Sequence, residues 1–277
     1  MRSPTSILLA ALLGLLIYVG NFAWWFEREV VHPEHFVDSA VVALGQVDSR
    51  DAMGRLIVDR LVDGYPLLIV VEASLVGMFS DLLATPALSM VVTSVGIDVH
   101  KAIVTGSQDA IVINLKEYRD PILAPIEAIA PQLAELVTEE WFVSIEVLEI
   151  GALPDLSLYA HWTNIARFVA IVGAVALTVF LLWFVKRRDL GTTLIGIALL
   201  FAGFVSALLV PGGRWLVIRD VNRLSIEVLV TSTYNEFTKS LLLSAAVLSL
   251  VGLAFIATGI ALRPAVEDDD SALPVDD

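Results

Sequence analysis

The sequence predicts a membrane α-helical protein, built as a bundle of four transmembrane helices with a mainly helical α+β domain outside the membrane. Of its 277 residues, 57% are hydrophobic, and the mean hydropathy of +0.80 exceeds what a soluble domain needs for one core. Charged residues make up only 17% of the chain and gather in a few stretches between long uncharged runs. Both observations are typical of a polytopic protein whose surplus apolar surface faces the lipid bilayer.

The first transmembrane helix is predicted within residues 1–26. An uninterrupted apolar run covers residues 7–19, and the apolar character continues to Phe26, which gives the about 20 residues that cross a bilayer. Trp24 and Trp25 suit the aromatic belt at a membrane surface. A secretory signal peptide begins in the same way, but the run lacks a good small-x-small cleavage site, so we favour an uncleaved anchor with a short cytoplasmic N-terminus.

Three further apolar runs, at residues 165–185, 192–210 and 241–262, are each close to the about 20 residues that a crossing needs. Their one charged residue, Arg167, lies near enough to an end for its side chain to reach the headgroups.

The orientation follows from the basic turn at residues 186–191, which contains Lys186, Arg187 and Arg188. The positive-inside rule assigns this turn to the cytoplasm. Both termini are then cytoplasmic, and residues 27–164 and the loop 211–240 lie outside. We expect a multi-pass protein of a bacterial plasma membrane.

Helical spacing of apolar residues in the outer domain predicts helices over residues 33–45 and 48–64, the latter capped by Asp48 or Ser49. Pro66 and Pro86 suit the first turn of two more helices.

In the later part of the outer domain, the spacing of apolar residues changes from a helical period to alternation. Apolar and polar residues alternate within 111–115 and 142–149, which predicts two short strands flanking a helical segment at about 121–137. The domain is then α+β, with a minor two-stranded element.

The run at residues 66–79 contains one charge, Glu72, and is too short to cross the membrane comfortably. We interpret it as a buried or interfacial helix instead of a fifth crossing. The wider apolar stretch, Pro66 to Val95, is either core, a docking surface or membrane-associated.

Two features predict tight coupling between the outer domain and the bundle. Residues 155–188 and 222–239 contain few helix breakers, so each is expected to extend a crossing outward as one long helix.

Small residues on the crossings favour close helix packing within the chain or between copies. They are Ala166, Ala170, Ala174, Thr178, Ser240, Ser244, Ala257 and Ala261.

Four segments in this order resemble a widespread group of uncharacterised actinobacterial four-crossing integral membrane proteins with an extracytoplasmic domain between the first and second transmembrane helices. They are residues 26–40 (FEREVVHPEHFVDSA), residues 145–150 (IEVLEI), the basic turn, and residues 234–239 (YNEFTK). The resemblance covers nearly the whole chain and implies the same topology. That group has no assigned catalytic residues, so the resemblance implies no site residue here.

Composition disfavours several classes of function. The formal charge of −14 disfavours nucleic acid as a partner, and the absence of cysteine removes thiolate ligands, disulfides and a cysteine nucleophile. The crossings lack an acid or base at mid-membrane depth, which disfavours a self-contained transporter. Much of the acid lies in the tail, residues 263–277, which is expected to be disordered in the cytoplasm.

The sharpest chemical candidate is the group His32, Glu34, His35 and Asp38. It departs from the helical H-E-x-x-H arrangement, and Pro33 keeps the two histidines out of one regular helix interior, so an ordinary acidic helix start is favoured.

The remaining polar candidates have ordinary explanations. These are the isolated histidines 100 and 161, the acids Glu139, Glu140, Glu146 and Glu149, and serines 49, 74, 80, 107 and 157, which lack a G-x-S-x-G elbow. We therefore expect no catalytic, cofactor-binding or metal-ligating residue and no cofactor.

The leading functional hypothesis is a noncatalytic membrane protein whose extracytoplasmic domain binds a protein partner, another copy of itself or an envelope component. An accessory subunit of an exporter or channel complex is the first alternative, favoured if Asn21 or Arg167 contacts a partner helix. A membrane-bound hydrolase with a dispersed site is the second.

Overall fold

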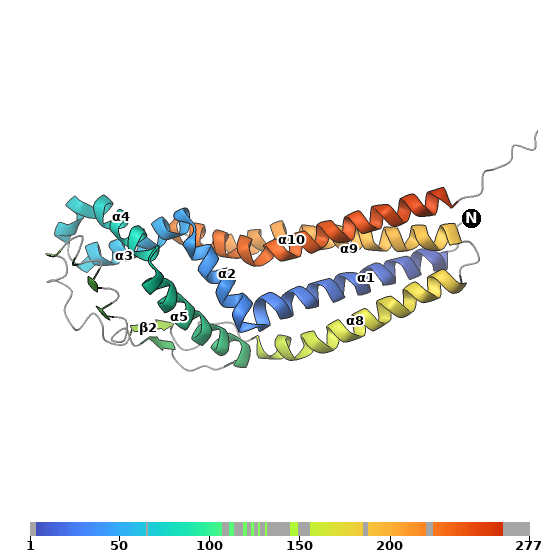
Figure 1. Cartoon of the computed structure of the whole chain (residues 1–277), viewed down its shortest axis with the longest axis horizontal. Coiled ribbons are helices and arrows are strands. Elements are labelled where there is room, and N and C mark those ends of the chain that lie inside the picture. Colours follow the sequence, from blue (N-terminus) through green and yellow to red (C-terminus); the bar gives the residue numbers. More distant parts are fainter. Residues whose placement is uncertain are drawn as a thin grey trace, which may run out of the picture.

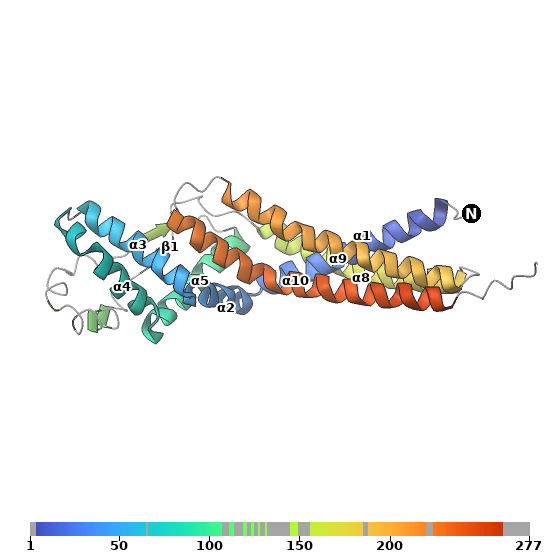
Figure 2. The ribbon, with the colours of Figure 1, turned by 90° about the horizontal axis from the view of Figure 1, so that it is seen from above.

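The computed structural model describes residues 4–64, 66–106, 111–113, 119–120, 123–124, 127, 131, 145–148, 156–184, 188–219 and 224–262. The molecule is elongated. Four long helices run along its length, and shorter helices gather at the end away from the N-terminus (Figure 1). The view from above shows the same division into a long bundle and an outer domain (Figure 2).

Four helices in the described part of the chain are long and apolar enough to cross a membrane. They are α1 (Pro4–Phe26), α8 (Ser157–Phe184), α9 (Arg188–Ile218) and α10 (Leu224–Ala261). Each coincides with one of the predicted crossings. The prediction of a multi-pass α-helical membrane protein is therefore confirmed at this level.

Helix α1 packs against both α8 and α9, while the most extensive contact in the molecule joins α9 to α10. Leu13 and Leu181 are fully buried and form a core with Ile195 and Ala198, so residues of α1, α8 and α9 meet at one point. The outward sides of α8 and α10 carry exposed apolar residues along their length, as expected for helices that face lipid.

The contact between α9 and α10 is a seam of small residues. A Cβ added at Gly196 would lie 2.6 Å from the carbonyl oxygen of Gly252, and one at Gly252 would lie 2.8 Å from the carbonyl oxygen of Gly196. Gly203 lies against Ala245 in the same way, and Gly259 against Thr193. Backbones this close leave no room for larger side chains, which is the usual basis of tight helix pairs in membranes.

Only some of the small residues singled out in the sequence lie at such contacts. Ala170 is buried and faces Gly20 of α1, but Ala257 and Ala261 are exposed. The face of α10 that meets α9 repeats every seven residues, at Ala245, Gly252 and Gly259, whereas the predicted pattern repeated every four.

Helix α9 is longer than the predicted crossing at both ends. It begins at Arg188 instead of Thr192, and it continues through Pro211, Gly212 and Gly213 to Ile218. Proline and glycine usually end a helix, but the hydroxyl of Tyr234 donates to the carbonyl oxygen of Val210 at 2.8 Å, and Gly213 packs against the same tyrosine. Packing on α10 thus holds this turn in helical form.

Helix α10 is continuous over 38 residues, so the predicted outer helix and the fourth crossing are one element. Its N-terminal part packs against α2 (Pro33–Gly45) and α3 (Val47–Gly64) of the outer domain. Helix α8 likewise begins at Ser157, before its predicted crossing. The prediction that long helices join the two parts is confirmed.

The outer helices begin largely where proline predicts. Pro33 opens α2, Pro86 opens α5 (Pro86–Thr105), and Gly106, with φ of 65°, ends α5 in the left-handed conformation that favours glycine.

The expectation at Pro66 was wrong in detail. Pro66 opens the 3₁₀ helix η2 (Pro66–Val71), and the α-helix α4 (Glu72–Leu83) begins only at Glu72. The segment before α4 contains Ile69, Val70 and Val71, and β-branched side chains disfavour the α-helix by restricting χ1.

Two short strands, β1 (Ile111–Ile113) and β2 (Ile145–Leu148), pair antiparallel within the segments where alternation predicts strands. Of the predicted helical segment between them, residues 123, 124, 127 and 131 are described, and each is helical. Lys186, Arg187 and the acidic tail at residues 263–277 lie outside the described residues.

Candidate functional site

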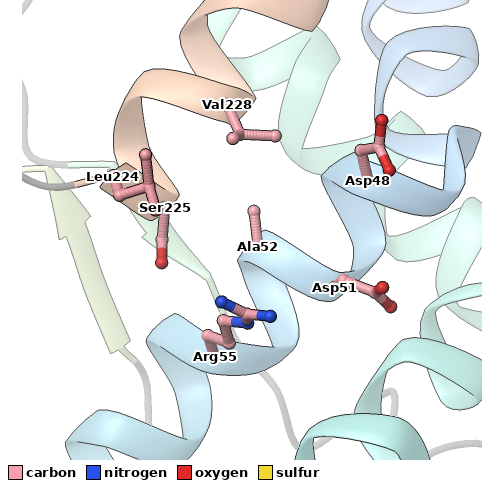
Figure 3. Close-up of a pocket in the computed structure, with 7 residues that line it drawn as sticks. All are labelled: Asp48, Asp51, Ala52, Arg55, Leu224, Ser225 and Val228. Carbon is pink, nitrogen blue, oxygen red and sulfur yellow. The ribbon is translucent and has the colours of Figure 1, made fainter.

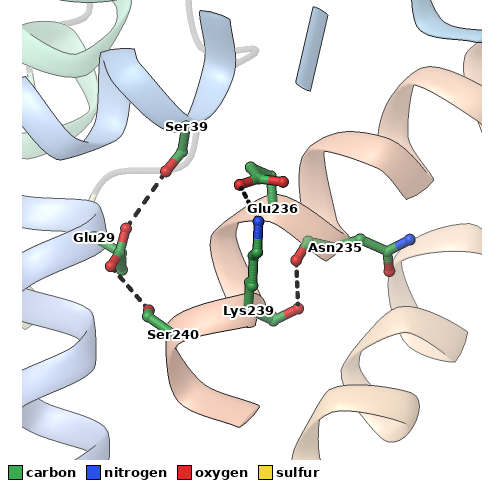
Figure 4. A network of polar contacts seen from close by, with 7 residues as sticks. Glu29, Ser39, Asn235, Glu236, Lys239 and Ser240 are labelled. Atoms are coloured by element: carbon green, nitrogen blue, oxygen red, sulfur yellow. Dashed lines mark hydrogen bonds and ion pairs between the residues drawn. The ribbon is translucent and has the colours of Figure 1, made fainter. Parts of the chain in front are cut away.

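The outer domain joins the bundle at a buried carboxylate. Helix α1 is followed directly by the π-helix η1 (Glu27–Val31), and Glu29, in its middle, is only 6% exposed. Ser240 of α10 donates to Glu29 Oε1 at 2.8 Å, and Ser39 of α2 donates to Oε2 at 3.4 Å (Figure 4). One side chain therefore links the first crossing, the fourth crossing and the first outer helix.

An aromatic cluster surrounds the same junction. His100 of α5 lies 2.9 Å from the carbonyl oxygen of Val30 through Nε2, and its ring centroid is 5.2 Å from that of Phe36. A carbonyl acceptor requires the proton on Nε2, so the contact defines the tautomer of His100. Phe36 in turn lies against Phe237 of α10, and Trp25 donates from Nε1 to the Phe237 carbonyl oxygen at 2.9 Å.

Two polar residues of the crossings have partners within the chain. Arg167 of α8 forms an ion pair with Glu27 of η1 and also contacts Asn164. Asn21 of α1 donates to the hydroxyl of Ser206, a fully buried residue of α9, at 3.2 Å. Polar pairs of this kind join the helices of a bundle to one another.

Contacts of the junction join helices that are far apart in the sequence. Its carboxylate accepts hydrogen bonds from serine hydroxyls, and its histidine donates to a backbone carbonyl. Neither arrangement is the nucleophile and base pair on which covalent catalysis depends. Sequence reasoning missed Glu29, although a signal existed, because Glu29 and Ser240 both flank the outer ends of predicted crossings.

A small pocket lies between α3 and the start of α10, with Arg55 extended toward Ser225 (Figure 3). Its volume is about 220 Å³, below the roughly 300–1,000 Å³ of ordinary ligand pockets. Asp51, on its edge, accepts a hydrogen bond from Ser80 of α4 at 2.5 Å, so that carboxylate joins two helices.

A larger cavity, of about 440 Å³, lies among α2, α3 and the connection from α4 to α5. Its walls include the apolar side chains of Val41, Leu44, Met53 and Val92, and Arg50 contributes a guanidinium. The volume falls within the range of small-molecule sites.

The connection from α3 to α4 lies at the end of the outer domain away from the N-terminus (Figures 1 and 2). Its apolar side chains point into solvent: Ile69 is 61% exposed, Val70 86% and Val71 45%. We refer to these three residues as the apolar tip.

The histidines singled out in the sequence do not come together. His32 is exposed before α2, His35 lies on α2, and His161 is exposed and stacks edge-on against Trp162. Among the described residues, no group of three or more histidine, aspartate or glutamate side chains is placed to hold a metal ion.

The serines and acids are similarly dispersed. Ser49 is fully buried and lies 2.6 Å from the hydroxyl of Ser232, Ser80 bonds Asp51, Ser74 is exposed, and Ser157 opens α8. Glu146 falls in β2. Ser107, Glu139, Glu140 and Glu149 lie outside the part of the chain that the structure describes.

The fold and these contacts define a multi-pass α-helical membrane protein in which a polar junction joins the long helices to a helical domain at one end. Comparison with known proteins finds no matching family model, no matching curated protein and no matching solved structure.

Proposed function

We propose that the chain is a noncatalytic integral protein of the bacterial plasma membrane, and that its extracytoplasmic α+β domain binds a protein partner. The observation that carries this proposal is the apolar tip, where three consecutive β-branched side chains are exposed at the end of the molecule. The proposed orientation, with both termini cytoplasmic, presents this tip away from the membrane. The resemblance to the actinobacterial four-crossing group remains part of the proposal.

The energetics favour a protein surface as the occupant. Fully burying a valine or isoleucine contributes about 1.5–3 kcal/mol, so Val70 would act as an anchor in a partner's pocket. Isolated exposed apolar residues are normal, but a contiguous set at a tip is more typical of an interaction site.

The long helices give such binding a mechanical consequence. At about 1.5 Å per residue, the 38 residues of α10 extend over roughly 57 Å. The helix reaches from the outer domain through its crossing, and Glu29 and the aromatic cluster fix it to α1 and α2 at the junction. A partner on the tip would therefore be held at a defined distance and orientation relative to the bundle.

The accessory-subunit alternative receives less support. It would be favoured if Asn21 or Arg167 contacted a partner helix, but both side chains already have partners within the chain, Ser206 and Glu27. A hydrolase with a dispersed site has no supporting contact among the described residues.

Site-specific photocrosslinking in intact cells tests the proposal. A photoreactive residue at Val70 should give an adduct of one defined mass, and Ile69→Asp in the same chain should abolish it. Ser74→Asp, on the exposed start of α4, is the matched control and should leave the adduct unchanged.

An adduct of twice the chain mass would identify the partner as a second copy. Absence of an adduct, or an adduct insensitive to Ile69→Asp, would contradict the proposal.

A further inference from the structure

The cavity among α2, α3 and the α4–α5 connection is lined by both apolar and polar residues. Val41 and Leu44 of α2, Met53 of α3 and Val92 of α5 supply the apolar walls. Arg50 of α3 and Ser89 of α5 supply polar groups. A pocket with mostly apolar walls and a few polar groups is typical of a small-molecule site.

Arg50 is the unusual member of the lining. Its Nε is buried, yet it has no hydrogen-bond partner among the described residues. Leaving a buried charged donor unpaired is costly, and native structures normally supply a partner. Arg50 as a whole residue is partly exposed and lines the cavity, so an acceptor inside the cavity can pair with its positive charge.

Neighbouring carboxylates do not fill this role. Asp51, the next residue, accepts the hydroxyl of Ser80, and within the described ranges no carboxylate lies at ion-pair distance from Arg50. Asp48 and Asp51 line the separate pocket between α3 and α10.

The start of helix α5 is a second source of positive potential at this cavity, beside Arg50. Thr85 and Pro86, at the start of the 20-residue helix α5, form part of the wall. Thr85 makes no side-chain cap to α5, because its hydroxyl donates to the Leu82 carbonyl oxygen at 2.7 Å. The amides of the first turn thus retain the capacity to bind an anion, and the helix dipole favours negative charge there.

We propose that this cavity binds a small single-chain amphiphile through an oxyanion held by Arg50 and the start of α5. The apolar chain packs on Val41, Leu44, Met53 and Val92. A carboxylate and a phosphate both match the fork of a guanidinium, so the shared chemistry is an oxyanion on an unbranched apolar chain. This site is distinct from the apolar tip and is independent of the proposed protein partner.

The test measures equilibrium binding of radiolabelled decanoate and decyl phosphate to the full chain in lipid nanodiscs, with empty nanodiscs subtracted. Saturable binding of one ligand per chain is expected. Decanol, which lacks the charge, and butyrate, which lacks the chain, should each bind at least about tenfold more weakly.

Arg50→Gln should weaken binding of both anions by about tenfold or more, since it removes the charge-assisted contact. Arg55→Gln is the matched control, because Arg55 lies on the same helix and lines the other pocket. It should bind as the unmodified chain does. Val92→Trp places a large ring in the cavity and should abolish binding while leaving Arg50 in place, which keeps the test valid if Arg50→Gln does not fold.

Tighter binding of decanoate identifies a carboxylate head, and tighter binding of decyl phosphate a phosphate head; both results support the site. Uptake equal to that of empty nanodiscs would overturn the proposal. So would unchanged binding in Arg50→Gln or, if that variant does not fold, in Val92→Trp.

Discussion

At the scale of single residues, the junction shows why burial of a charged group is hard to predict from sequence. Glu29 stands in a stretch with Glu27 and Arg28 that has the composition of a solvated surface, yet it is buried. Its partner Ser240 lies 211 positions away. Sequence spacing reports neighbours on one helix, whereas this contact depends on how α1 and α10 pack.

The partners of His100 and Arg50 also depend on packing between helices, so sequence neighbours do not predict them. His100 is isolated in the sequence, and its ordinary role as a packed histidine is visible only once α5 lies against η1 and α2. Arg50 lies beside Asp51 in the sequence, which suggests local charge pairing, but Asp51 bonds Ser80 instead. The residues next to Arg50 in the sequence therefore do not predict that its Nε lacks a partner among the described residues.

A double-mutant cycle tests the energetic role of Glu29. Glu29→Ala should lower the free energy of unfolding by about 1–3 kcal/mol, because the part-buried hydroxyl of Ser240 loses its acceptor. Combining it with Ser240→Ala should give a coupling energy of about 0.5–3 kcal/mol, measured by chemical denaturation of the purified protein in detergent.

The pair Glu236 and Lys239, on the same helix, is the control for this cycle. The Lys239 side chain is 74% exposed, so water screens the 3.3 Å contact and the corresponding coupling should be about 0.5 kcal/mol or less. Equal coupling in the two pairs would contradict a special role for Glu29.

At the scale of elements, apolar runs of about 20 residues predicted all four long helices because length and composition alone decide them. Boundaries were less predictable. The Pro211, Gly212 and Gly213 sequence signals a stop, yet tertiary contacts with Tyr234 carry α9 past it. At Pro66 the opposite occurs, because the proline predicts an α-helix but the β-branched residues after it form a 3₁₀ turn.

The seam between α9 and α10 provides the test at this scale. Gly196→Ala should destabilise the protein by about 1–3 kcal/mol, because its new Cβ would overlap the backbone of Gly252. Gly212→Ala, on the same helix with open space around it, should be neutral or stabilising by up to about 1 kcal/mol from helix propensity. Thermal unfolding of both variants in one detergent measures the difference, and a loss of stability in Gly212→Ala alone would argue against the seam.

At the scale of the whole molecule, the two parts are connected by helices that extend beyond the predicted crossings. Helices α8 and α10 both begin before their predicted crossings, and α1 passes directly into η1. The sequence predicted this continuity for α8 and α10, because helix breakers are rare in residues 155–188 and 222–239. It did not predict which outer helices meet α10, since contacts with α2 and α3 depend on packing across the fold.

The orientation of this assembly rests on the basic turn at Lys186, Arg187 and Arg188, and cysteine labelling tests it. The chain contains no cysteine, so introduced thiols report without background. Cysteines replacing Glu34 and Ser74, both exposed on the outer helices, should react with a membrane-impermeant thiol reagent in intact spheroplasts. A cysteine replacing Ser271, in the tail, should react only after permeabilisation.

Replacing all three basic residues by glutamate should make every position partly reactive, because it removes the positive charge on which the predicted orientation depends. Labelling of Ser271→Cys alone in intact spheroplasts would reverse the orientation and place the apolar tip in the cytoplasm.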